Sequence, residues 1–240
     1  MLREYPARVK MEGQRTLRGR AHQILRDELL AGRLKPGQRV NEVQVAAAIG
    51  VSRGTLREAI RTLEQEGVFV SIPHRGTFVR RFTPQEAEEL QEVRQSLETT
   101  AAQRVARAWS PPVRGYLEQR LHELRAAYDS ALPFPDRLAA DLAFHEAICE
   151  SSGNLTLLEL WRSLIGNITV LQLNVGEDRM TPLQAPGDHE ALLASIASRD
   201  DAKIRTVFAR VFDDGRRVVA SAVEEDAAAG DERIATATDC

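Results

Sequence analysis

Apolar and polar residues alternate with a helical period along most of the chain. The first predicted helix spans residues 16–31, and its apolar face consists of Leu17, Ala21, Ile24, Leu25 and Leu29. Two shorter helices follow, with apolar faces formed by Val43, Val45, Ala46 and Ile49 and then by Leu56, Ile60 and Leu63. Gly50 suits the turn between these two helices, and Ser52 suits the N-cap of the second.

A β-hairpin is predicted directly after this helix pair. Residues 68–72 and 77–79 are rich in apolar and β-branched side chains, and they flank a turn at residues 73–76. Two helices joined by a tight turn and followed by a hairpin form the pattern of a winged helix-turn-helix.

The rest of the chain is predicted to be helical. Thr83 suits an N-cap, with Pro84 at the first helical position and Glu86 in the first turn. Helical patterns cover residues 84–109, 112–130, 135–151, 154–175, 184–198 and 200–227. We therefore expect a mainly α protein, with an N-terminal winged helix-turn-helix and a C-terminal antiparallel bundle of about six helices.

These patterns predict four segments. A flexible arm of residues 1–14 precedes a winged helix-turn-helix domain of residues 15–82. An all-helical domain of residues 83–228 follows, and residues 229–240 are small and polar and are expected to be a disordered tail.

Charge separates the two predicted domains. The chain has a net charge of −3, but residues 1–83 carry 16 Lys and Arg against 8 Asp and Glu. Residues 84–240 carry 16 against 27. A basic front half attracts a polyanion such as nucleic acid, whereas the acidic back half is repelled by it and must serve another purpose.

The second helix of the helix-turn-helix carries polar side chains suited to DNA. Ser52, Arg53, Thr55 and Arg57 lie near its start or on its open faces, where they can contact bases and phosphates of the major groove. His74 and Arg75 lie at the hairpin tip, which can reach a phosphate or the minor groove. The alternative is a small helical domain whose arginines are only solvated.

Four segments of this half resemble the winged helix of GntR-family transcriptional regulators. They are residues 34–42, 49–59, 63–67 and 73–77. The resemblance implies that Arg53, Arg57, His74 and Gly76 approach DNA. Val43 stands where the family has a DNA-contacting arginine, and Gly54 stands where it usually has threonine.

Asp141 and His145 form a candidate metal site in the helical half. At i and i+4 their side chains share one helix face, and His189 is the natural third donor. A carboxylate and imidazoles that converge in a helical bundle can bind a divalent transition metal. A structural hydrogen bond between Asp141 and His145 is the alternative.

The segments at residues 141–145, 152–154 and 188–193 resemble the C-terminal effector domain of FadR-like GntR regulators. The resemblance implies a divalent metal (zinc, nickel or manganese) held by Asp141, His145, His189 and one more histidine. The position of that histidine, 22 residues after His189, is Val211 here. Three ligands plus water, or a substitute carboxylate from Asp213 or Asp214, could hold the metal; a metal-free pocket is the alternative.

Arg94 is a candidate effector-binding residue. By resemblance it matches an arginine that often faces the effector cavity, where a guanidinium suits a carboxylate or phosphate. The alternative is a surface salt bridge with Glu98 at i+4. Asn167, with Gln172 and Asn174, interrupts an otherwise apolar helix and could line the same cavity.

These features predict a ligand-responsive repressor that binds a palindromic operator as a homodimer and senses a small carboxylate. One rival is a metal-dependent enzyme fused to a DNA-binding module, using the three metal ligands to activate water. No phosphate-binding loop or nucleophile elbow accompanies them, so we expect no enzyme. A second rival is an architectural DNA-binding protein with no cavity near Arg94 and His145.

We expect a cytoplasmic protein without a membrane partner. No apolar run approaches the roughly 20 residues that span a bilayer, and the first residues lack the apolar core of a secretory signal. Two cysteines do not suggest a disulfide framework.

Overall fold

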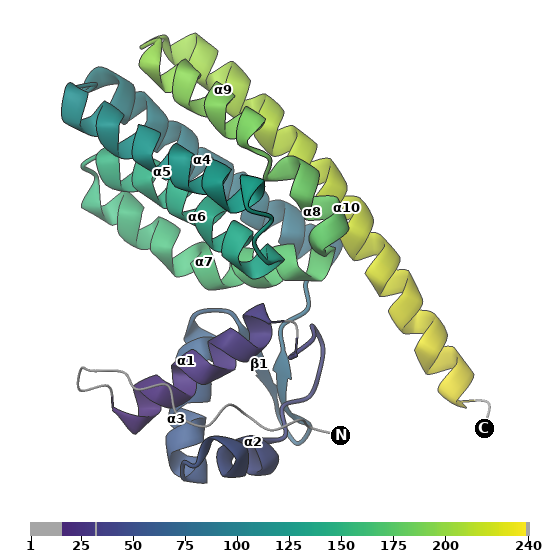
Figure 1. The fold of residues 1–240 in the computed structure, drawn as a ribbon. Coiled ribbons are helices and arrows are strands. Elements are labelled where there is room, and N and C mark those ends of the chain that lie inside the picture. The colour runs from purple at the N-terminus through teal and green to yellow at the C-terminus, as the bar shows by residue number, and fades with distance from the viewer. Residues whose placement is uncertain (1–15, 32, 239–240) are drawn as a thin grey trace. The chain divides into compact units, whose positions relative to one another are not determined.

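The computed structural model describes residues 16–31 and 33–238, and the side chains of these residues except Leu30 and residues 226–238. The predicted arm at residues 1–14 therefore lies outside the described residues. The chain divides into two compact units between Arg81 and Phe82, next to the boundary expected at residues 82 and 83. Figure 1 shows the elements of each unit.

The first unit is a winged helix-turn-helix, as predicted. Its elements are α1 (Leu17–Leu30), α2 (Glu42–Ile49), α3 (Arg53–Gln65), β1 (Phe69–Ile72) and β2 (Gly76–Val79). The two strands pair antiparallel, with Phe69 opposite Val79 and Ile72 opposite Gly76.

Local signals fix the helix-turn-helix. Asn41 caps α2 by accepting a hydrogen bond from the Gln44 N–H at 3.2 Å. Gly50 ends α2 with a left-handed φ of 71°, a conformation that costs glycine least. Ser52 then caps α3 by accepting from the Thr55 N–H at 3.1 Å. The turn between the helices is therefore encoded by the C-cap of α2, Gly50, and the N-cap of α3, Ser52.

The predicted stripe of α3 forms the core of this unit. Leu56, Ile60 and Leu63 are buried and pack toward α1, whose Leu25 is also buried. The prediction for α2 was wrong at one position, because Val43 is 56% exposed. This helix of eight residues buries Ala46 and Ile49 and half-buries Val45, and Val43 lies outside that narrow face.

The second unit is an all-helical bundle, which confirms the predicted fold class. Its described helices are α4 (Pro84–Arg107), α5 (Pro111–Asp129), α6 (Phe134–Ser151), α7 (Leu155–Val175), α8 (Glu177–Leu183), α9 (Pro186–Ala197) and α10 (Asp201–Thr238). The predicted capping box starts α4, since the Thr83 side chain and the Glu86 side chain each bond the other residue's backbone N–H.

Two helix predictions were wrong in this unit. The short helix α8 was missed because Pro182, which the sequence pattern treats as a breaker, lies inside it. The last helix does not end near residue 227 but continues to Thr238, so the tail expected to be disordered is helical up to that residue. Repeated alanines explain the extension, since alanine has the highest helix propensity.

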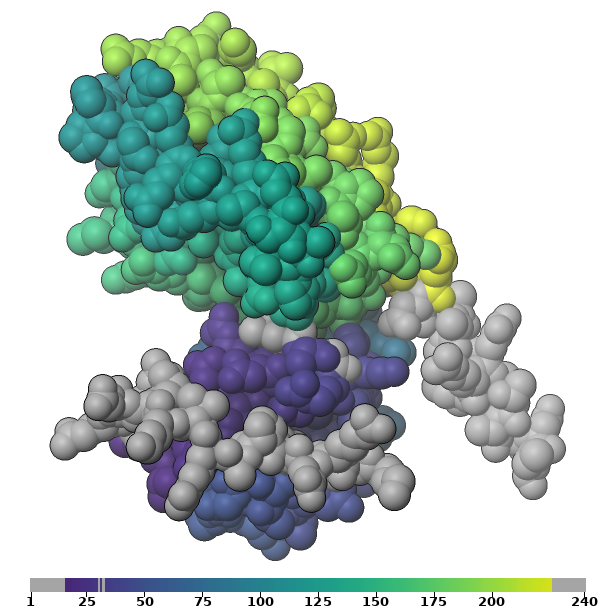
Figure 2. All heavy atoms as spheres, in the orientation of Figure 1, coloured from purple at the N-terminus to yellow at the C-terminus, as the bar shows by residue number. Residues whose placement is uncertain are grey.

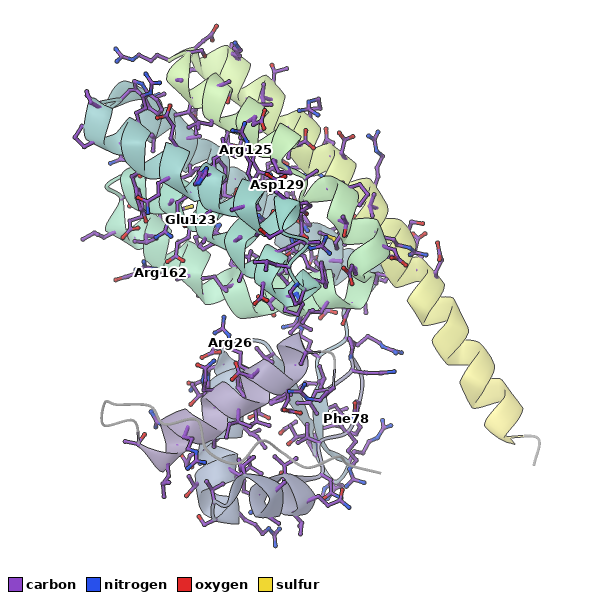
Figure 3. The ribbon with its side chains drawn as sticks, in the orientation of Figure 1. Arg26, Phe78, Glu123, Arg125, Asp129 and Arg162 are labelled. Carbon is purple, nitrogen blue, oxygen red and sulfur yellow. The ribbon has the colours of Figure 1, made fainter. Side chains whose placement is uncertain are left out.

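Side chains of α4, α5, α6, α7, α9 and α10 form the core of the bundle. Its largest fully buried side chains include Trp161, Phe144, Phe208, Leu117, Leu124 and Ile148. In the space-filling view, side chains of the teal and green helices cover this core (Figure 2). Polar residues such as Arg125 and Asp129 on α5 and Arg162 on α7 are exposed (Figure 3). On α6, Asp141 and His145 are buried, whereas Asp136 and Glu150 are exposed.

In the described part of the chain, none of the helices combines the length and apolar composition needed to cross a bilayer.

Leu56→Ala should lower the free energy of unfolding of the winged helix by about 2–5 kcal/mol, because Leu56 is fully buried and leaves a cavity. The matched control is Val43→Ala, which should change it by about 0.5 kcal/mol or less because Val43 is exposed. Urea denaturation measures both. Equal losses in the two variants would contradict the core described here.

Candidate functional site

Three potential metal ligands meet inside the helical unit. Asp141 and His145 come from α6 and His189 from α9, and one ligand atom of each lies within 4.8 Å of the others. All three residues are at most 5% exposed. The Asp141 Oδ1 atom is 2.9 Å from His189 Nε2 and 3.9 Å from His145 Nε2. The structure thus brings together the three residues that the sequence suggested.

Both histidines use their other ring nitrogen for a protein partner. His145 Nδ1 lies 2.6 Å from Glu98 Oε2, and His189 Nδ1 lies 3.1 Å from the Ala185 carbonyl oxygen. Each Nδ1–H can donate to its acceptor, which leaves the Nε2 atoms on the side of Asp141. Metal-binding histidines in proteins are usually held in this way, by a carboxylate or a backbone carbonyl on the far nitrogen.

Glu98 on α4 joins several parts of this site. Its carboxylate is fully buried and also accepts from Arg94 Nε at 2.7 Å and from Trp161 Nε1 at 2.9 Å. Burial raises the pKa of Glu98, but the charges of Arg94 and His145 and the hydrogen bonds outweigh it and lower the pKa to about 2. Glu98 is therefore ionised, and it orients the His145 ring.

The charged forms of Arg94 and Asp141 are stabilised by neighbouring groups of opposite charge. Burial lowers the pKa of Arg94, but Glu98 and Asp141 outweigh it and raise the pKa above its usual value. Burial raises the pKa of Asp141, and the hydrogen bond and charge of His189 outweigh it and lower the pKa. The Asp141 Oδ2 atom is buried without a hydrogen-bond partner among the described residues. A cation at the cluster would satisfy that oxygen.

A cavity of about 50 Å³ adjoins the cluster. On the same measure one water needs roughly 10–15 Å³, so a group of a few atoms fits. Its lining includes Arg94, Asp141, His145, Gln91, Gln172, Met180, Leu183, Gln184, Val211 and Phe212. The Oε1 atom of Gln172 and both amide atoms of Gln184 are buried without a protein partner among the described residues. The cavity thus offers polar groups that only a ligand or water could satisfy.

Arg94 was expected either to face an effector cavity or to form a surface salt bridge with Glu98. It does pair with Glu98, but the pair is buried rather than a surface salt bridge, and Arg94 also lines the cavity. Asn167 is half-buried on α7 and is not among the residues that line this cavity, whereas Gln172 on the same helix is.

Val211 lies in the cavity wall and offers no ligand atom. The two suggested substitutes have other partners, since Asp213 pairs with Arg216 and Asp214 with Arg217. Neither belongs to the ligand cluster found among the described residues.

Sequence reasoning missed two residues of this site. Glu98 was considered only as a surface partner of Arg94, and its contacts with His145 and Trp161 span 47 and 63 positions. Gln184 was expected only as the first residue of the helix predicted over residues 184–198, but it lies between α8 and α9. The available signal for Glu98 was its position one turn after Arg94, in line with Ala101 and Val105 on one face of an amphipathic helix.

The predicted DNA-contacting residues lie together in the first unit. Arg53 and Arg57 on α3 are exposed. Ser52 and Thr55 bond each other at the start of the helix, with 2.9 Å between their hydroxyl oxygens. Arg57 Nε donates to Glu42 Oε2 on α2 at 2.8 Å. The start of α3 therefore presents hydroxyl and guanidinium groups at the surface.

The hairpin tip has a fixed shape. His74 has a left-handed φ of 62°, and the Arg75 N–H donates to the Ile72 carbonyl oxygen at 3.0 Å. Gly76 has a φ of 104°, and a Cβ atom there would lie 3.1 Å from Arg39 Nε. The backbone conformation therefore favours glycine at this position, and a side chain there would also require Arg39 to shift. His74 and Arg75 are exposed.

A winged helix-turn-helix joined to a helical bundle is the architecture of a class of DNA-binding transcriptional regulators. Residues 17–79 match the model of the bacterial regulatory proteins of the gntR family, and residues 89–214 match that of the FCD domain. The chain belongs to the GntR family of DNA-binding transcriptional regulators, in the FadR-like branch that carries an FCD domain.

Several known proteins are similar to this chain. The uncharacterized HTH-type transcriptional regulator YdhC of Bacillus subtilis (strain 168) is 30% identical over 57% of this chain and 61% of its own length. The "Probable D-xylose utilization operon transcriptional repressor" of Paenarthrobacter nicotinovorans is 31% identical over 61% of this chain and 64% of its own length. The matches thus span less than two thirds of the length of each of these two relatives.

The fold also occurs in a solved structure, E. coli McbR/YncC, with a TM-score of 0.68. The two sequences are 20% identical, and the match covers 86% of this chain and 98% of the other. The relatives are transcriptional regulators rather than enzymes, which argues against the rival of a metal-dependent enzyme.

Glu98→Gln should lower the free energy of unfolding of the helical unit by about 3–5 kcal/mol, because it leaves the buried Arg94 charge unpaired. Glu118→Gln is the matched control, since Glu118 pairs with Arg114 at the same i,i+4 spacing but on the surface, and it should cost about 0–1 kcal/mol. Chemical denaturation followed by circular dichroism measures both. A small loss in Glu98→Gln would mean that this carboxylate does not hold the helices together.

Proposed function

We propose that this regulator represses transcription from a palindromic operator as a homodimer and responds to a small carboxylate bound in its helical unit beside a divalent metal. The observation that carries the proposal is the buried cluster of Asp141, His145 and His189 at the wall of a cavity that also contains Arg94. The rival hypothesis of an architectural DNA-binding protein predicts that no cavity lies near Arg94 and His145. The cavity beside these two residues argues against it.

The residues present fit a metal ion. Two imidazoles and one carboxylate suit zinc, nickel or manganese. The Nδ1 contacts of His145 and His189 orient the rings, and the unpaired Asp141 Oδ2 atom favours a cation. Such a metal would act as a Lewis acid that binds an effector oxygen. Since Val211 offers no donor, three protein ligands leave coordination positions for water or the effector.

Charge favours an anionic effector. With a divalent ion at the cluster, the two buried carboxylates of Glu98 and Asp141 do not balance the ion and Arg94, so the cavity keeps a positive charge. Arg94 can donate to a carboxylate, and the unpaired amides of Gln172 and Gln184 can bond further oxygens. The cavity volume limits the enclosed part of the effector to a few atoms. Asn167 remains a weaker candidate, because it does not line the cavity.

For DNA binding we propose that α3 enters the major groove with Ser52, Arg53, Thr55 and Arg57 at its start. The hairpin tip, with His74, Arg75 and Gly76, would contact the neighbouring backbone or minor groove. Exposure of the charged side chains and the basic charge of residues 1–83 support this placement. A homodimer would place two such helices on two half-sites, so that the operator is palindromic.

Repression is proposed rather than activation because the similar protein from Paenarthrobacter nicotinovorans is described as a "Probable D-xylose utilization operon transcriptional repressor". Effector binding would change the spacing of the two recognition helices in the dimer. Because each half-site must be met in register, a small change of spacing costs contacts on both half-sites.

The metal is tested by elemental analysis of untagged protein after incubation with zinc, nickel or manganese. Wild type should retain near-stoichiometric metal, and His145→Ala should lose it because one of three ligands is removed. His122→Ala is the control, since His122 is exposed on α5 and lies outside the cluster, and it should keep the metal. Wild-type protein without bound metal would refute the metal part of the proposal.

DNA docking is tested with Arg53→Ala and Arg57→Ala. Each should weaken specific binding by about 1–3 kcal/mol, because each removes a base or phosphate contact of the recognition helix. Arg114→Ala, a surface arginine of the helical unit, controls for lost charge and should leave binding unchanged. Quantitative footprinting on a duplex selected from a random pool measures all three. Wild-type footprints from both α3 variants would rule out this docking.

A further inference from the structure

Three arginines on the exposed side of α3 differ in how they are paired. Arg53 has no hydrogen-bond partner among the described residues. Arg61 Nη1 donates to Glu58 Oε1 at 2.7 Å, one turn earlier on the same helix. Arg57 instead donates from Nε to Glu42 on the other helix of the motif, at 2.8 Å. Of these three arginines, only Arg57 therefore has a side-chain hydrogen bond to the other helix of the helix-turn-helix.

The bond to Glu42 leaves the end of Arg57 available. A guanidinium has five N–H donors, one on Nε and four on the two terminal nitrogens. Among the described residues, the hydrogen bond of Arg57 uses Nε alone. The Arg57 side chain is 56% exposed, whereas that of Glu42 is 22% exposed. The carboxylate is thus the better-anchored partner, and the terminal nitrogens stay free for another molecule.

We propose that Glu42 is a positioning residue for base recognition, which rests on the proposed docking of α3 in the major groove. An arginine recognises guanine by two parallel bonds, to O6 and N7. A guanidinium fixed at Nε has fewer orientations to lose on binding, and both terminal nitrogens can donate side by side to one base. Glu42 therefore prepares Arg57 to bind a guanine.

Simple electrostatics gives the opposite expectation. A carboxylate close to a DNA-binding helix repels phosphates, so its removal should strengthen binding to every duplex. Positioning predicts that its removal weakens binding only to the specific sequence. The two explanations therefore differ in sign, and one pair of duplexes distinguishes them.

The test uses the full-length chain, a duplex selected from a random pool by the wild-type protein, and a scrambled duplex of the same composition. Fluorescence anisotropy measures affinity for both, and for a panel in which each G·C pair of the selected site is changed. Glu42→Gln should weaken binding to the selected duplex about tenfold and reduce discrimination at the base pair that Arg57→Ala also affects. Binding to the scrambled duplex should stay equal or become tighter.

Glu58→Gln is the matched control, because it removes the same charge from the partner of Arg61 without touching Arg57. It should keep the discrimination of wild type. In the Arg57→Ala background, Glu42→Gln should cause no further loss on the selected duplex, since the arginine it acts through is absent.

Three results would overturn the inference. If Glu42→Gln binds the selected duplex as tightly as wild type while Arg57→Ala does not, Glu42 does not position Arg57, and the proposed DNA binding stands. If Arg57→Ala also binds like wild type, Arg57 recognises no base and the inference fails; the docking of α3 fails as well only if Arg53→Ala binds like wild type too. If Glu42→Gln weakens both duplexes equally, or lowers the melting temperature of the winged helix, Glu42 acts on the fold rather than on base recognition.

Discussion

The packing of the helical unit depends on a fully buried carboxylate, that of Glu98. Removing a carboxylate from water costs several kcal/mol unless close partners compensate. Here the partners are Arg94 on the same helix, His145 on α6 and Trp161 on α7. Because hydrogen bonds tolerate little change in distance, these three helices can pack in few other ways.

The same carboxylate links stability to the site. It fixes the ring of His145 and pairs with Arg94, and both of these residues line the cavity. Many arrangements of the helices would bury the apolar core, but few would also form the hydrogen bonds of the polar cluster. Yet Asp141 Oδ2 and the amides of Gln172 and Gln184 stay unpaired among the described residues. The Glu98 carboxylate therefore has its hydrogen-bond partners, whereas polar groups at the cavity lack them. A ligand in the cavity would supply those partners.

Local signals explain why most of the fold could be predicted. Ser52 and Thr83 cap the helices that the pattern assigned to them, and Leu56, Ile60 and Leu63 are buried as their spacing indicates. The errors also have local causes. The short helix α8 contains a proline that the pattern treated as a break, and alanines extend α10 beyond its expected end. Val43 was predicted to be buried because it is apolar, but it is exposed. Composition does not indicate which turn of a short helix contacts its neighbour.

The sequence by itself determined most of the helices, the caps at Ser52 and Thr83, and the shared face of Asp141 and His145. These features depend on residues within one or two turns of each other. Only the tertiary structure decided that His189 meets Asp141, that Glu98 holds His145, and that Gln184 and Val211 share one cavity wall. Those contacts join positions tens of residues apart on different helices. Their distances depend on how the helices pack, which no local period or spacing records.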